Sequence, residues 1–288
     1  MGILSGLKNM GVDLKKEDMF ENNKPKTAPK PKPQPVVKAS NVENEEDFVL
    51  ARTFTCPICE SSFKSLKVKS NRARLVGTDI DLRPVHAPLD TLKYAVTSCP
   101  VCGYSALQRN FDSVTSKQRK LIQEKRIRGF ERDPLWEDKT IYTYDEAIMQ
   151  YELALQAAVT KEAKSSEKAY LCLMMAWIVR GKKDTLKETD PNYKKTYDDC
   201  VSAEAELIQS ACDGFIDARA TETYPMVGYD QYTMDYLLSA LLYECGKYED
   251  SVRILGELIT SNGTNSRIKD RARTLKEMVF AKLSEKNQ

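Results

Sequence analysis

Apolar side chains in the second half of the chain recur every three to four residues, which is the period of an α-helix. The last such segment carries charged side chains on its opposite face, as expected of a helix that caps a stack. From residue 115 onward, the pattern predicts helices over residues 116–129, 143–160, 166–180, 191–220, 231–245, 247–261 and 267–285.

Glycine, proline and an acidic residue set the expected ends of these helices. Gly181 stands where the C-terminus of a helix favours glycine. Asp190 and Pro191 form a start signal, an N-cap acid followed by proline at the first helical position. Pro225 and Gly228 break the chain before the next helix.

The first half of the chain lacks the helical period. Residues 51–110 have the pattern of short strands and turns, residues 92–97 alternate with period two, and residues 63–76 alternate loosely between apolar and basic side chains. Residues 1–20 carry a weak amphipathic pattern that favours a frayed terminus. Prolines and lysines interleave in residues 22–48, so residues 1–50 are expected to be a disordered tail with an extended Pro/Lys-rich linker.

Two stretches of the helical half show the alternation of small and large residues by which tetratricopeptide repeats nest their helices. In residues 144–155, two tyrosines and two alanines alternate at positions i, i+3, i+7 and i+10. The alternative is a generic helical bundle, because the repeats are degenerate and unevenly spaced. The second stretch follows the order of a whole repeat through Leu238, Ser239, Leu242, Gly246, Tyr248, Ser251 and Leu255.

Four of the eight cysteines form two CxxC pairs, CPIC and CPVC, in the β module. Gly103 follows the second pair and permits a positive φ. Two cysteines on one tight turn can point at the same ion, and two such turns complete a tetrahedral four-sulfur shell, which suits zinc. The expected metal ligands are Cys56, Cys59, Cys99 and Cys102.

A shell of four thiolates is closed, so the expected zinc is structural and offers no open position for water. Iron in a rubredoxin-like shell is the chemical rival. Thiol–disulfide exchange would need a CxxC that opens a helix, and neither pair has that setting. The single histidine, His86, lies between the pairs and is expected to be an ordinary turn residue. Ordinary buried thiols are expected for Cys172, Cys200, Cys212 and Cys245.

Charge is distributed unevenly, although the formal net charge of the chain is +2. Residues 51–133 carry 16 Lys and Arg against 8 acids, whereas residues 134–288 carry 20 against 26. The basic module permits contact with a nucleic-acid backbone, but few aromatic side chains interleave for stacking, and the acidic half offers an internal partner. Asp79, Asp81 and Arg83 are expected to form a solvated or salt-bridged turn. The basic runs are Lys64, Lys67, Lys69, Arg72 and Arg74, then Lys117, Arg119, Lys120, Lys125, Arg126 and Arg128.

Sequence signatures of catalysis are missing. The chain contains no GxSxG, no GxxxxGK[ST] and no GxGxxG, so we expect no enzyme and no catalytic residues. No apolar run approaches the length of about 20 residues that spans a bilayer, and the first fifteen residues are too polar for a signal peptide. A cytoplasmic protein without a membrane span is expected.

The order of the motifs resembles a bacterial family, domain of unknown function 2225. The resemblance covers roughly residues 50–265 and implies a metal-binding N-terminal part, a tetratricopeptide-like C-terminal part and no established activity. Ser251 departs from it, because repeats usually carry alanine there. The matching segments are CPIC at 56–59, DIDLRP at 79–84, CPVCGYSA at 99–106, AIMQYELAL at 147–155, AWIVR at 176–180 and GKYE at 246–249.

Together these observations predict a mainly α protein with a small β module: a zinc-ribbon-like domain at residues 51–112 followed by tetratricopeptide-like helical repeats at residues 113–288. The function that fits is a non-enzymatic, zinc-binding interaction scaffold whose concave helical surface binds a protein or peptide partner. The alternative is a nucleic-acid-binding or regulatory protein that uses the basic ribbon. It predicts steep salt dependence and loss of binding on charge reversal at Arg72 and Arg74. The identity of the partner and the oligomeric state stay open.

Overall fold

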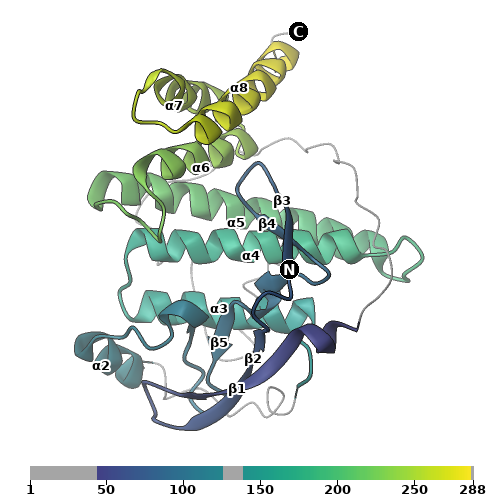
Figure 1. Cartoon of the computed structure of the whole chain (residues 1–288), viewed down its shortest axis with the longest axis vertical. Coiled ribbons are helices and arrows are strands. Elements are labelled where there is room, and N and C mark those ends of the chain that lie inside the picture. The colour runs from purple at the N-terminus through teal and green to yellow at the C-terminus, as the bar shows by residue number, and fades with distance from the viewer. Residues whose placement is uncertain (1–43, 126–138, 287–288) are drawn as a thin grey trace.

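The computed structural model describes residues 44–125 and 139–286. It confirms the expected fold class, a mainly helical chain with small antiparallel strand pairs (Figure 1). The weak amphipathic segment at residues 1–20 and most of the linker lie outside the described residues. The ordered chain begins before residue 51, because Phe48 and Val49 are buried in a small cluster with Tyr94 and Tyr142.

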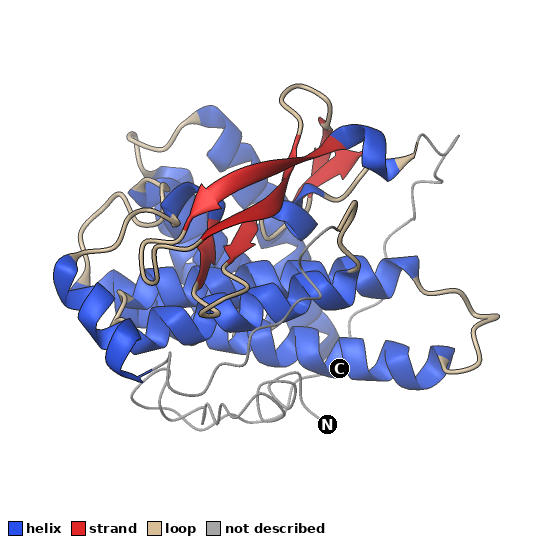
Figure 2. Ribbon diagram, turned by 90° about the horizontal axis from the view of Figure 1, so that it is seen from below, coloured by secondary structure: helices blue, strands red, loops and turns tan. Residues whose placement is uncertain are grey.

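The described strands form three separate two-stranded sheets. β1 (Val49–Thr55) pairs with β2 (Ser62–Val68), β3 (Arg74–Thr78) with β4 (Pro84–Ala87), and β5 (Val96–Ser98) with β6 (Ser105–Leu107). Figure 2 shows these strands lying over one face of the helices. The strand expected at 92–97 is shorter than predicted. Residues Thr91–Tyr94 form a 3-10 helix, η3, because the Asp90 carboxylate accepts the Leu92 backbone N–H at 3.0 Å and caps it.

The helices agree with the predicted ones within a few residues at their ends. Thr143 and Glu146 form a reciprocal capping box before the first long helix, and Asp230 accepts the Thr233 N–H at 2.8 Å before another. Residues 126–129 of the first predicted helix lie outside the described part. The observed helices are α2 (Ser116–Lys125), α3 (Tyr144–Thr160), α4 (Ser165–Thr185), α5 (Tyr193–Thr221), α6 (Gln231–Glu244), α7 (Tyr248–Thr260) and α8 (Ser266–Lys286).

Two helix ends differ from the prediction for identifiable reasons. Gly181 does not end α4, which continues to Thr185. A Cβ on Gly181 would stand 2.8 Å from Asp90 Oδ2, so the glycine serves a close approach between α4 and the β module. Asp190 does not cap α5; its carboxylate accepts the Lys187 N–H at 3.2 Å, and α5 begins at Tyr193.

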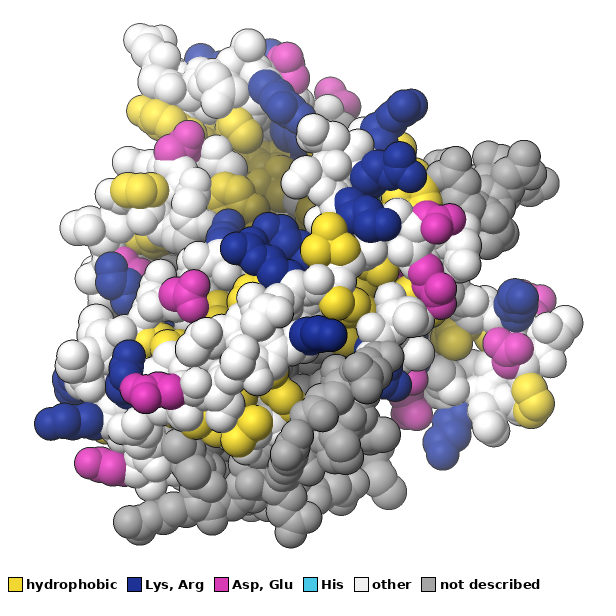
Figure 3. Space-filling model, turned by 60° about the horizontal axis from the view of Figure 1, so that its bottom comes forward, with side chains coloured by type: hydrophobic (Ala, Val, Ile, Leu, Met, Phe, Trp, Pro, Cys, Tyr) yellow, Lys and Arg dark blue, Asp and Glu magenta, His cyan; other side chains and the backbone are white. Residues whose placement is uncertain are grey.

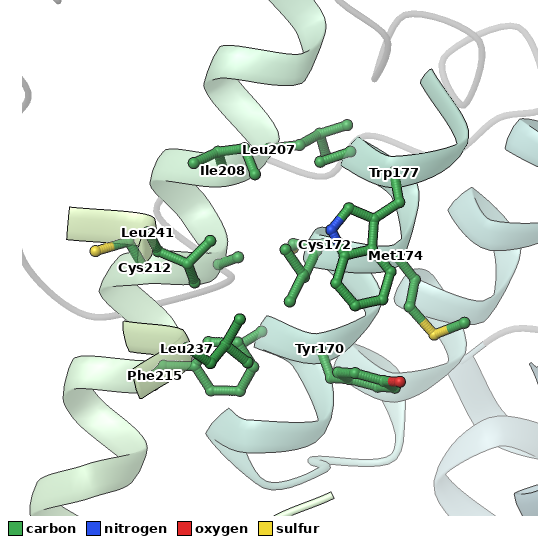
Figure 4. Packing of buried hydrophobic residues seen from close by; sticks show 14 of the residues in the cluster. Tyr170, Cys172, Met174, Trp177, Leu207, Ile208, Cys212, Phe215, Leu237 and Leu241 are labelled. Carbon is green, nitrogen blue, oxygen red and sulfur yellow. The ribbon is translucent and has the colours of Figure 1, made fainter. Parts of the chain in front are cut away.

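The main core runs from α3 to α8, and Figure 4 shows the part of it to which α4, α5 and α6 contribute. The side chains of α4 are buried on nearly every side of the helix from Ala169 to Val179. Trp177 is the largest side chain in this core, and Tyr170 meets its ring edge-on at 6.2 Å. The sequence pattern at 144–155 is confirmed as a buried face, because Ala147, Tyr151 and Ala154 are each at most 1% exposed.

The second repeat-like stretch forms the pair α6 and α7, joined by a turn at Gly246, whose φ is +72°. Ser239 and Ser251 are both fully buried where the two helices meet, and the Ser251 hydroxyl donates to the Ser239 carbonyl at 2.9 Å. Serine therefore replaces alanine here without an unpaired polar atom. None of the described helices combines the length and apolar character needed to cross a bilayer.

Candidate metal centre

Each CxxC pair occupies a tight turn between two paired strands. In the first turn, Cys56 N donates to Ser61 O and Cys56 O accepts from Glu60 N, both at 2.9 Å. In the second turn, Cys99 makes the same two bonds with Tyr104 and Gly103 at 2.8 and 2.9 Å. The residue after the second cysteine has a positive φ in both turns, +62° at Glu60 and +70° at Gly103. The expected role of Gly103 is confirmed, and Glu60 adopts the same strained conformation without being glycine.

The two turns bring the four predicted cysteines together. Their sulfur atoms all lie within 4.8 Å of one another. The Cys56 and Cys102 sulfurs are 3.6 Å apart, as are those of Cys59 and Cys99. A tetrahedral shell with metal–sulfur bonds of about 2.3 Å has sulfur–sulfur distances of about 3.8 Å. The cluster therefore has the chemistry and the spacing of a four-thiolate metal site.

The cluster is enclosed by the rest of the module. Cys56 and Cys99 are fully buried and Cys102 nearly so. Aromatic rings surround the sulfurs, and Tyr104 donates its hydroxyl to the Phe111 carbonyl at 3.1 Å. From α2, the Gln123 side-chain amide donates to the carbonyl of the first turn at Ile58, at 2.9 Å. Three of the four cysteines are therefore buried, and Cys59 is partly exposed.

The pKa values of two of the clustered thiols, Cys99 and Cys102, are shifted in opposite directions. Hydrogen bonds from Cys102 and Cys56 lower the pKa of Cys99. Hydrogen bonds with Cys56 and Cys99, together with burial, raise the pKa of Cys102 far above its usual range. A bound cation would favour the thiolate form of Cys102, because metal ligation requires deprotonated sulfurs.

Other residues that the sequence singled out lie away from this cluster. His86 is on β4, where its Nδ1 is 2.9 Å from the Thr91 hydroxyl, and burial lowers its pKa. Within the described ranges 44–125 and 139–286, the four cysteines are the one group of three or more potential metal ligands that lie close enough together to hold an ion.

The turn that joins β3 to β4 reaches into the helical region, which the sequence did not predict. Asp81 is fully buried and accepts from Trp177 Nε1 at 2.8 Å and from Arg180 Nη2 at 2.9 Å. Arg180 also reaches Glu204 at 2.5 Å and Glu244 at 3.3 Å. The salt-bridged interpretation of this turn was right, but its burial was missed because its partners stand about a hundred positions later in the sequence.

Against the cost of burial, the charges of Asp81, Glu244 and Glu204 raise the pKa of Arg180. Arg83 adds a second cation to this network, 3.7 Å from Asp79. We call Asp79, Asp81, Arg83, Arg180, Glu204 and Glu244 the ion network.

The fold and the cluster together define a helical protein with a four-cysteine module. The chain belongs to a family of uncharacterised proteins conserved in bacteria, domain of unknown function 2225, which matches residues 49–279. The resemblance noted from the motifs is thereby confirmed, over a slightly longer stretch than roughly 50–265. No curated protein and no solved structure matches the chain.

Proposed function

We propose that this protein is a non-enzymatic interaction scaffold that holds one structural zinc ion through Cys56, Cys59, Cys99 and Cys102. The observation that supports the zinc assignment is the proximity of four sulfurs, all within 4.8 Å of one another and three of them on buried cysteines. The ion would supply the folding free energy that a module of two-stranded sheets cannot obtain from its small core. A closed, buried shell argues against a catalytic metal.

Elemental analysis of the full chain tests the metal assignment. One zinc per chain is expected, and the double variant Cys99→Ser/Cys102→Ser should contain none. The matched control is Cys200→Ala, which removes a buried thiol outside the cluster and should retain the ion. Iron at one equivalent, or no metal together with a reducible disulfide, would overturn the assignment.

The proposed partner surface is a groove between the tip of the β3–β4 hairpin and the helices α6 and α8. Its volume is about 390 Å³. Ile80 and Met278 offer apolar contact, which suits an extended peptide with an apolar anchor. Arg271, Asp79 and Asp270 offer charges of both signs for its polar groups. The groove is lined by Thr78, Asp79, Ile80, Tyr236, Asp270, Arg271, Thr274, Leu275 and Met278.

Site-specific photo-cross-linking in cells tests this surface. A photoreactive side chain at Met278 should capture a discrete partner, and the same side chain at exposed Phe280, outside the groove lining, should not. Filling the groove with Thr274→Trp should abolish the cross-link. Equal capture at both positions, or capture that Thr274→Trp leaves unchanged, would contradict the proposal.

A second candidate function, binding of single-stranded nucleic acid, is favoured by one specific observation. Figure 3 shows Lys and Arg side chains near a hollow with an apolar floor on the face drawn there. A groove of about 450 Å³ at β1, β2 and the segment after β6 is lined by Arg52, Phe54, Lys67 and Arg109, among others. The Arg52 guanidinium lies 5.7 Å from the centre of the Phe54 ring. Cations beside an aromatic ring suit a phosphate backbone and a stacked base.

Part of the remaining basic charge is engaged within the chain, and this candidate is centred on the groove at Arg52 and Lys67 rather than on Arg72 and Arg74. Lys93 pairs with Glu45 at 2.6 Å and Lys117 with Glu162 at 3.3 Å, while Arg72 lies over the Phe48 ring. Fluorescence anisotropy with a labelled oligonucleotide distinguishes the two locations. Binding should fall steeply with salt and vanish in Arg52→Glu/Lys67→Glu, with Arg72→Glu/Arg74→Glu as the matched control. If Arg72→Glu/Arg74→Glu loses more binding than Arg52→Glu/Lys67→Glu, the binding site lies at β3 instead.

A further inference from the structure

Cys59 is the least buried residue of the four-cysteine cluster. It is partly exposed, whereas the other three cysteines are each at most 3% exposed. Cys59 lies in the first turn, and the residue after it, Glu60, has a φ of +62°. Local opening of this turn would therefore bring the Cys59 ligand into solvent before the other three.

Two side chains of α2 contact the residues on either side of Cys59. On one side, Gln123 Nε2 donates to the Ile58 carbonyl at 2.9 Å. On the other side, Arg119 Nη1 lies 3.7 Å from Glu60 Oε1. Gln123 and Arg119 are four positions apart, so both project from the same face of the helix. One helix thus holds the chain on both sides of a single predicted ligand.

The contact of Gln123 also bears on a second ligand. The Ile58 carbonyl belongs to the peptide group that joins Ile58 to Cys59, and the Ile58 N–H donates to Cys56 Sγ at 3.4 Å. Hydrogen bonds outside the ligand shell orient the ligands and tune their hold on a metal. Gln123 therefore acts on Cys59 and Cys56 through the backbone of Ile58, without a printed contact to either sulfur.

The helix α2 has few buried contacts of its own. Ile122 is its one buried residue, and this side chain belongs to the same buried cluster as Cys56 and Cys102. The ion pair of Lys117 with Glu162 is exposed on both sides, by 80% and 56%, and such pairs contribute little. Segments with few buried contacts open at a low cost in free energy. The helix can therefore leave the first turn while the main helical core stays folded.

We propose that α2 is a clamp on Cys59 that sets the rate of metal exchange, with Gln123 as its positioning residue. This inference rests on the proposed zinc site. When α2 moves away, the bond between the Cys59 sulfur and the metal breaks, the thiolate takes a proton from water, and a competing ligand occupies the free position. While α2 is in place, the turn holds Cys59 where its bond re-forms before a competitor binds.

Transfer of zinc to an excess of the chelator pyridylazoresorcinol measures the exchange rate on the zinc-loaded full chain. Gln123 lies at the surface, so its substitution leaves the core of the module intact. Gln123→Glu keeps the size of the side chain but replaces the donor by an acceptor. It should release zinc about 3- to 10-fold faster, as expected for the loss of one hydrogen bond. Gln123→Lys keeps a donor and should release zinc at close to the wild-type rate.

Two further variants of α2 serve as controls. Gln118→Glu adds the same charge to the same helix and keeps an acceptor for the Thr115 N–H, which Gln118 Oε1 accepts at 3.1 Å. It should release zinc at the wild-type rate. Arg119→Ala should accelerate release by less than Gln123→Glu, because its partner Glu60 is 81% exposed. High salt should remove the Arg119 effect.

Alkylation with iodoacetamide during release identifies the ligand that opens first. Mass spectrometry should find Cys59 modified first in the wild type, and sooner in Gln123→Glu, with the helical circular dichroism unchanged. Wild-type release by a zinc-loaded Gln123→Glu, or first modification at another cysteine of the cluster, would overturn the clamp and leave the zinc assignment intact. A chain purified without metal would overturn the zinc assignment and the clamp with it. The order of alkylation in the wild type holds as a test even if a variant misfolds.

Discussion

The cysteine module (residues 51–112) and the helical region are stabilised in different ways. The module has a small core whose buried members include three of its own cysteines. The helical region buries a continuous core from α3 to α8 around Trp177. A two-stranded sheet is marginal on its own, so we expect the module to need the proposed metal, whereas the helices bury a large apolar core.

The two regions are nevertheless joined by shared packing and by charge. Leu92, Val96 and Leu107 of the module belong to the main core of the helices. The Tyr151 hydroxyl of α3 donates to the Leu92 carbonyl at 3.0 Å. The β3–β4 turn adds the ion network. A perturbation of the module should therefore reach the helices in part, and its extent measures how independent the two regions are.

Removal of the metal should have the largest effect. Structural zinc is worth roughly 10–16 kcal/mol in isolated zinc-finger peptides, so chelation, or Cys99→Ser/Cys102→Ser, should unfold the module. Limited proteolysis should then cleave within residues 51–112, while circular dichroism retains most of the helical signal. Loss of the whole helical signal would show that the helices do not stay folded without the module. Unchanged protease resistance would show that the module does not need the metal to stay folded.

Breaking the ion network should have the next largest effect. Arg180→Ala leaves the buried Asp81 and the half-buried Glu244 without the cation that pairs with them, whereas Glu204 keeps Lys183. Loss of one partner of a buried ion pair typically costs about 3–5 kcal/mol in the free energy of unfolding. Burial raises the pKa of Glu244 to about 8 and Arg180 opposes that rise, so the deficit should increase as pH rises through about 8. Urea denaturation at two pH values measures both effects.

The matched control for Arg180 is Arg253 on α7, whose side chain is 60% exposed and lies 3.6 Å from Asp250. Exposed ion pairs are worth less than about 1 kcal/mol, so Arg253→Ala should be nearly neutral at either pH. Similar losses for the two variants would mean that the network does not fasten the regions together.

Two helical glycines, Gly181 and Gly256, test the contact between α4 and the cysteine module. In Gly181→Ala, the new methyl would meet Asp90 Oδ2 at 2.8 Å and the Tyr144 ring at 2.9 Å. Overpacking of this kind costs about 1–3 kcal/mol. Gly256→Ala on α7 meets nothing within 4 Å and should stabilise by about 0.5–1 kcal/mol. Thermal unfolding of the two variants measures the difference. If both variants are more stable than the wild type, the side chains around Gly181 can move to accept the new methyl group.

Local patterns were sufficient to predict most of the fold. The period of the apolar residues predicted the helices, and the two CxxC motifs predicted the four clustered cysteines. Each of these patterns is formed by residues that are close in sequence. Gly181 was misread because its role is set by Asp90 and Tyr144, which stand far from it in the chain. The pairing of Asp81 with Arg180 was missed for the same reason, since no local periodicity encodes it.

The two cysteine turns invite a smaller test within the module. Gly103 and Glu60 share a positive φ, and an ordinary L-residue pays about 1–2 kcal/mol there. Gly103→Ala should therefore lower the thermal stability of the zinc-loaded protein. Glu60→Gly should raise it by less, because glycine also increases the entropy of the unfolded chain. If both changes destabilise, the Glu60 side chain contributes more than its strained backbone costs.

The smallest expected effect is the titration of His86, the single histidine of the chain. Burial lowers its pKa, and the nearby Asp90 opposes the shift only in part. A histidine whose pKa is lower in the folded state favours folding in its neutral form. Its contribution is therefore present above the unfolded pKa of about 6.5 and is lost as pH falls below that value. The ring signal in an NMR titration of the full chain should give a pKa below that of an unfolded control peptide, and His86→Gln should flatten the stability profile slightly below pH 7. A His86 pKa above that of the control peptide would mean that the Asp90 charge outweighs burial. It would also mean that β4 packs less tightly against η3 than the helices pack against one another.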